Sequence, residues 1–66
     1  MKGFIEVTDI DLGFKILFPI GKVTAVISDD DGVYVEFGTD KNGKPLGNFV
    51  SESYDEIKRQ IKENEV

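Results

Sequence analysis

The sequence predicts an α+β domain of four or five antiparallel strands, in a strongly curled sheet or small partial barrel, with one C-terminal α-helix. Short runs of β-branched and aromatic residues, separated by turns that carry glycine and aspartate, fill most of the chain. Near Ser53 the apolar period changes from two residues to three or four. With 66 residues there is room for a single small domain, 1–66.

A first hairpin is expected close to the N-terminus. Residues 3–8 are rich in β-branched and aromatic side chains, and the same pattern resumes over residues 14–18. Between them, Asp9 can bond its own backbone and Gly13 can take a positive φ, as a tight turn requires. The proline and glycine that follow predict a break or bulge over residues 18–22.

A second hairpin has the strongest signal in the chain. Residues 23–28 and 33–37 are β-branched runs joined by an aspartate cluster that ends in glycine, 29–32. The next stretch, 38–47, contains three glycines, an asparagine and a proline, and is expected to be a polar surface loop. A short last strand is predicted at 48–50.

A helix is predicted from Tyr54 to about Asn64. Ser53 followed by Glu56 fits a capping box, in which both side chains satisfy free amides at the helix start. Asp55 can pair with Arg59 one turn later. The helix has one apolar stripe, formed by Tyr54, Ile57 and Ile61.

Composition narrows the classes of function. Thirteen acidic and eight basic residues give a net charge of −5, which disfavours nucleic acid as a partner. The apolar stretches are far shorter than the ~20 residues that cross a bilayer, so no membrane insertion and a cytoplasmic location are expected. The chain contains no cysteine and no histidine, which removes the usual zinc, iron–sulfur and thiol chemistries.

The acidic residues are interpreted as turn formers and solvated surface, so no catalytic, cofactor or metal site is predicted. If Gly32 is placed at the sixth position of a calcium loop, Gly38 falls at the twelfth, where a bidentate carboxylate belongs. Glu6 and Glu36 lie within strands, but on the face opposite the apolar set. The sequence therefore predicts a protein that is not an enzyme.

Alternation along the strands leaves apolar residues on both faces of the predicted sheet. The expected core beneath the helix consists of Ile5, Val7, Ile16, Phe18, Val35, Phe37, Ile57 and Ile61. The opposite face is expected to carry Phe4, Leu17, Val26 and Tyr34. These four residues form a second core in a curled sheet or barrel, an interface with a protein partner or a second copy, or scattered surface apolars.

Several segments together resemble the flagellar FlbD/SwrD-like family of short prokaryotic and phage proteins. They are the opening strand 4–8, the turn at Gly13, the middle segment 23–27 and the helix start 50–57. The chain differs from that family in its longer 38–47 stretch. The resemblance implies a small cytoplasmic accessory protein that supports the flagellar motor without catalysing a reaction.

The sequence thus favours a small non-catalytic interaction or accessory protein that binds a protein partner or itself. The alternative is a regulatory protein associated with nucleic acid. Two local groups of basic residues could serve that alternative: Lys41 and Lys44 in the expected loop, and Lys58, Arg59 and Lys62 on the predicted helix. A steeply salt-dependent affinity for DNA would favour it.

Overall fold

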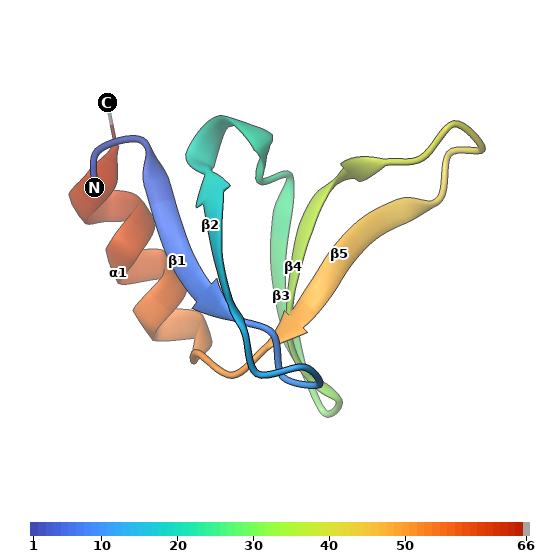
Figure 1. Ribbon diagram of the computed structural model, residues 1–66, viewed down its shortest axis with the longest axis horizontal. Coiled ribbons are helices and arrows are strands. Elements are labelled where there is room, and N and C mark those ends of the chain that lie inside the picture. Colours follow the sequence, from blue (N-terminus) through green and yellow to red (C-terminus); the bar gives the residue numbers. More distant parts are fainter. Residues whose placement is uncertain (66) are drawn as a thin grey trace.

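In the computed structural model, which describes residues 1–65, the chain forms five β-strands, a short 3₁₀ helix and a C-terminal α-helix (Figure 1). Along the chain these are β1 (Phe4–Thr8), β2 (Lys15–Pro19), η1 (Ile20–Lys22), β3 (Ala25–Asp29), β4 (Gly32–Thr39), β5 (Pro45–Val50) and α1 (Tyr54–Asn64). The predicted α+β class and the bounds of the helix are confirmed.

The strands lie in two antiparallel sheets and not in the single curled sheet that was predicted. β1 pairs with β2, and the second sheet has the order β3-β4-β5. The sheets meet at one corner, where Asp9 bridges Val50 and Ser51 N donates to Thr8 O at 2.9 Å. Beyond that corner the chain turns away into α1, so β5 and β1 diverge (Figure 1).

The turn between β1 and β2 has the predicted chemistry. The Asp9 carboxylate accepts hydrogen bonds from the backbone amides of Asp11 and Leu12, at 2.9 and 2.8 Å. Gly13 has a φ of 76°, which a side chain would strain. The Asp9 side chain therefore closes the turn by bonding the backbone two and three residues further on, as the sequence indicated.

Half of the expected surface loop over 38–47 is strand, which corrects that prediction in part. β4 continues to Thr39 and β5 begins at Pro45. Asp40 makes this compact turn, because its carboxylate accepts from Asn42 N at 2.8 Å and Lys44 N at 3.0 Å. The glycine-rich composition did not indicate this long hairpin, in which β4 and β5 remain paired as far as Thr39 and Pro45 beside the turn.

The core lies between the two sheets and the helix. The buried apolar side chains are Ile5, Val7, Phe18, Val35, Val50 and Ile57. All except Val50 were predicted, while the predicted Ile16, Phe37 and Ile61 are partly buried against this cluster. The Phe18 and Phe37 rings, with centroids 5.2 Å apart, join the sheets across the core.

Helix α1 lies beside β1 and covers its open edge (Figure 1). Glu6 N donates to Gln60 Oε1 at 2.8 Å, and Gln60 Nε2 donates back to Glu6 O at 2.9 Å. Thr8 N donates to Glu52 Oε1 at 2.7 Å. The side chains of Gln60 in the helix and Glu52 just before it thus take the place of a neighbouring strand. They satisfy backbone hydrogen-bonding groups of Glu6 and Thr8 at this sheet edge.

The helix begins at Tyr54 as predicted, but the Glu56 carboxylate bonds Arg59 and Gln60 instead of completing the capping box. The ion pairs also differ from those expected. Ser53 Oγ accepts from Glu56 N at 3.1 Å. Arg59 does not pair with Asp55; it lies between Glu56 and Glu63, with each N···O distance 2.6 Å. Two carboxylates one turn to either side hold the guanidinium more favourably than one.

Replacing Ser53 with alanine is expected to lower the free energy of unfolding by about 1 kcal/mol, because the first turn loses its side-chain acceptor. Urea denaturation measures the change. Ser51→Ala is the matched control, since the cap is at Ser53, and should leave stability close to that of the parent. Equal losses in both variants would contradict the observed cap.

Candidate protein-binding surfaces

The four residues predicted to share an apolar face are not brought together. Phe4 and Leu17 lie on the β1–β2 sheet, whereas Val26 and Tyr34 lie on the other sheet. Leu17 is opposite Glu6 and 46% exposed. A single face could not form because the strands divide between two sheets.

Val26 faces the core, which corrects its assignment to the outer face. It is the cross-strand partner of Val35, which is fully buried, and cross-strand partners share a face. Tyr34 is opposite Ile27 and points to the other side of the sheet. Placing Val26 beside Tyr34 would require a register one residue away, and such a slip exchanges the two faces of a strand.

An apolar row crosses the face of the β3-β4-β5 sheet that is turned away from the core. Tyr34 lies between Ile27 on β3 and Phe49 on β5, and its ring is 5.0 Å from that of Phe49, centroid to centroid. Ile10 continues the row, because its amide donates to Phe49 O at 3.0 Å. We call Ile10, Ile27, Tyr34 and Phe49 the outer row. Ile10, Ile27 and Phe49 are 53, 43 and 38% exposed.

The surroundings of the outer row fix its shape and charge. A Cβ at Gly47 would lie 2.6 Å from Tyr34 Cζ, so a glycine is needed there for the ring to lie against β5. By alternation, Asp29 and Glu36 lie on the same face, on either side of the row. The outer row is therefore an apolar strip with acidic flanks.

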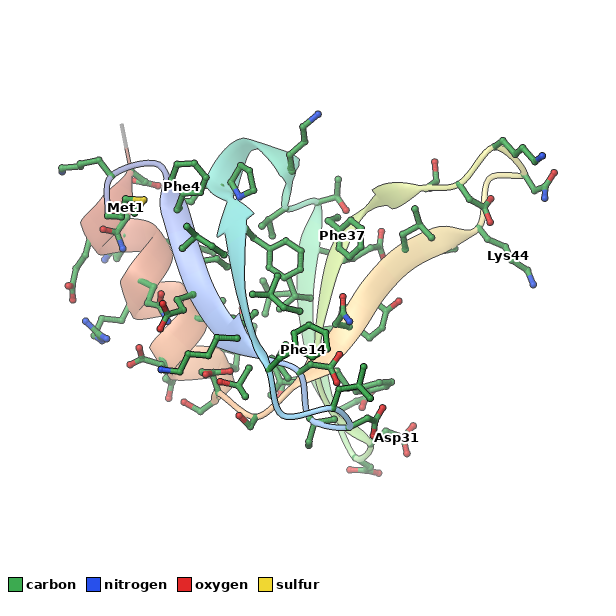
Figure 2. The ribbon with its side chains drawn as sticks, in the orientation of Figure 1. Met1, Phe4, Phe14, Asp31, Phe37 and Lys44 are labelled. Atoms are coloured by element: carbon green, nitrogen blue, oxygen red, sulfur yellow. The ribbon has the colours of Figure 1, made fainter. Side chains whose placement is uncertain are left out.

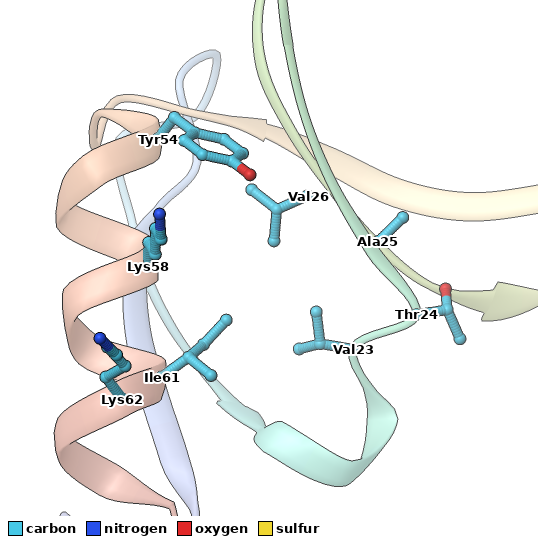
Figure 3. Close-up of a pocket in the computed structure, with 8 residues that line it drawn as sticks. All are labelled: Val23, Thr24, Ala25, Val26, Tyr54, Lys58, Ile61 and Lys62. Atoms are coloured by element: carbon cyan, nitrogen blue, oxygen red, sulfur yellow. The ribbon is translucent and has the colours of Figure 1, made fainter.

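A groove of about 350 Å³ separates α1 from β3 (Figure 3). Its apolar lining comes from Val23 and Val26 on one wall and Tyr54 and Ile61 on the other. Lys58 and Lys62 stand on the helix wall and are the charged residues that line it. Within residues 1–65 neither lysine belongs to an ion pair, whereas Arg59 between them is held by two glutamates.

The aspartate-rich turns bind their own backbones, as predicted. Asp29 Oδ1 accepts from Asp31 N at 2.9 Å, and Asp40 uses its carboxylate in the same way. In the part of the chain that the structure describes, no three acidic side chains are grouped to hold a metal ion. Asp31 and Lys44 mark turns at opposite ends of the three-stranded sheet (Figure 2).

Asp9 is the buried carboxylate, 6% exposed, at the corner where the sheets meet. Besides its two turn bonds, it accepts a hydrogen bond from Asn48 Nδ2 at 2.8 Å. The Leu12 amide first, and then the Asn48 amide, hold the pKa of Asp9 below its usual value of 3.8. These bonds tie the first turn to β5, which is a structural role.

Comparison with known proteins does not assign a function to these surfaces. No family model, curated protein or solved structure matches the chain. Within residues 1–65, none of the helical structure has the length and apolar character that a bilayer crossing requires. The outer row and the groove are therefore the surfaces that bear on function.

Proposed function

We propose that the chain is a small, cytoplasmic, non-catalytic accessory protein that acts by binding a protein partner through the outer row. The supporting observation is the alignment of apolar side chains, one per strand across β3, β4 and β5 and continued by Ile10; Tyr34 at the centre is half-buried and the other three are exposed. Scattered surface apolars are ordinary, but contiguous ones usually mark an interface. Tyr34 is the anchor, because it is central and combines a large ring with a polar tip.

The partner that fits this strip is a basic amphipathic helix lying across the strands. Neighbouring strands are about 4.8 Å apart and a helix rises about 5.4 Å per turn, so successive apolar residues of a helical stripe meet successive members of the row. Asp29 and Glu36 flank the strip and would attract lysine or arginine beside that stripe. The resemblance to the FlbD/SwrD-like family adds that this partner belongs to the flagellar motor.

The test is a titration of the ¹⁵N-labelled protein with a synthetic helical peptide that carries a leucine stripe flanked by lysines. We expect amide shifts to concentrate at Tyr34 and Phe49, and Phe49→Lys to weaken binding about 30-fold, the scale of an interface hot spot. Leu17→Lys is the matched control, because Leu17 is a similarly exposed strand residue on the other sheet. Equal weakening by both variants, or none by Phe49→Lys, would reject the outer row as the binding surface.

A further inference from the structure

The edges of the two sheets are protected unequally. The edge of β1 is covered by Gln60 and Glu52. The free edge of β2 carries Lys15 and Pro19, the residue types that discourage edge-to-edge pairing. The three-stranded sheet has two edge strands, β3 and β5. β5 begins at Pro45, and its last residues are bonded to Asp9 and Ile10 of the first turn. β3 reads Ala-Val-Ile-Ser-Asp and contains neither lysine nor proline.

The outward-facing backbone groups of β3 follow from its register. Thr24 N donates to Glu36 O at 2.8 Å, so that carbonyl is directed at β3. Backbone groups of an antiparallel strand alternate between its two sides, so Ile27, the partner of Tyr34, is also bonded towards β4. Val26 and Ser28 therefore direct their N–H and C=O groups away from the sheet, and Val26 lines the groove.

We propose that this edge pairs with β3 of a second copy of the chain, antiparallel about a two-fold axis at Ile27. In that register Val26 is opposite Ser28 of the second copy, and the outward groups of both exchange hydrogen bonds. Two three-stranded sheets then become one continuous sheet. An isologous axis makes each contact twice, which lets a strand of this length hold a dimer.

Charge supports a second copy as the occupant. The pairing places Asp30 and Asp31 of the second copy alongside Thr24 and Val23, at one wall of the groove. The facing wall carries Lys58 and Lys62 (Figure 3). In both halves of the dimer an acidic turn is thus set against two lysines that form no ion pair within residues 1–65.

The pairing also extends the outer row. Ile27 of each copy lies at the junction, so the two apolar strips become one that runs across the joined sheets. The dimer does not depend on the proposed function, because it uses the edge of β3 and not the face that carries Tyr34. Failure of either proposal leaves the other standing, and their readouts differ: peptide affinity for one and oligomeric state for the other.

Sedimentation equilibrium over a wide concentration range tests the pairing. The parent should dimerise, and Ser28→Pro should raise the dimer dissociation constant at least about tenfold, because it removes an outward N–H from both copies. Proline is tolerated at an edge position whose N–H faces outward, so this variant should remain folded by circular dichroism. Ser28→Ala, which keeps the N–H, should dimerise like the parent.

A charge-swap mixture tests the register. Lys58→Glu with Lys62→Glu, and separately Asp30→Lys with Asp31→Lys, should each weaken self-association at least about tenfold by like-charge contact. Mixed together, the two variants should form a heterodimer, since both contacts are again between opposite charges. A monomeric parent at all concentrations, a folded Ser28→Pro variant that still dimerises, or a mixture that stays monomeric would overturn the proposal. A dimer split by Phe49→Lys but not by Ser28→Pro would overturn it too, and would assign dimerisation to the outer row.

Discussion

Replacing Ile57 with alanine should lower the free energy of unfolding by about 2–5 kcal/mol, a large share of the stability of a small domain. Ile57 is fully buried and is the helix residue at the centre of the core. It packs in one cluster with Ile5 and Val7 of one sheet and Val35 of the other. Within residues 1–65, backbone hydrogen bonds join the two sheets only at one corner, so a cavity at Ile57 weakens the side-chain contact that holds them together.

Urea and thermal unfolding at neutral pH measure this effect. Ile61→Ala is the comparison, because Ile61 lies one turn away on the same stripe but is only partly buried, and its loss should be smaller. If Ile57→Ala unfolded at the same temperature and urea concentration as the parent, the helix would not be packed against the core.

Asp9→Ala is expected to lower Tm by the order of 10 °C, through loss of the bonds that close the first turn and reach β5. Asn48 Nδ2 loses its carboxylate acceptor in a part-buried site, which adds to the cost. Asp40→Ala is the matched control, because the Asp40 carboxylate also accepts two backbone amides, but in an exposed turn. It should lower Tm by much less.

The effect of Asp9 should depend on pH with a definite sign. Hydrogen bonds from Leu12 N and Asn48 place its folded pKa below the usual 3.8. Its contribution to stability is therefore complete above that value and is lost as the pH falls through the lower, folded pKa. The stability difference between the parent and Asp9→Ala should be constant near neutral pH and narrow under acid. A difference that stays constant to about pH 2 would contradict this assignment of the proton linkage.

Elements set by neighbouring residues could be predicted from the sequence. Ser53 and the apolar stripe marked the helix, and the turn at 29–32 marked the β3–β4 hairpin. In these cases one or two side chains bond the backbone nearby, so the signal is local. The loop predicted at 38–47 is wrong at both ends, because a glycine-rich composition does not reveal that the Asp40 turn lets the flanking residues pair.

Features that depend on distant segments could not be predicted in the same way. Gln60 covers the edge of β1 from 54 residues along the chain, and nothing near Glu6 signals it. Which face of the sheet Val26 occupies depends on the pairing register of β3 with β4. The alternation of apolar residues alone does not determine that register.

The candidate surfaces were found only in part from the sequence. Tyr34 was identified as an outward apolar residue, but its neighbours Ile27 and Phe49 were not. Counting outward from the Asp29–Gly32 pair places Ile27 opposite Tyr34, so the hairpin turn held that information. The groove lies between β3 and a helix far along the chain, and only the folded structure brings Val26 and Lys58 to its two walls.

Amide hydrogen exchange, measured at several protein concentrations, tests most directly whether β3 is the open edge. Ile27, directed at β4, should exchange slowly throughout, as should Glu6, whose amide is bonded to Gln60. Val26 and Ser28 should exchange fast in dilute solution and slow progressively as the concentration rises and the edges pair. Rates at Val26 and Ser28 that do not change with concentration would contradict the pairing of β3 with a second copy.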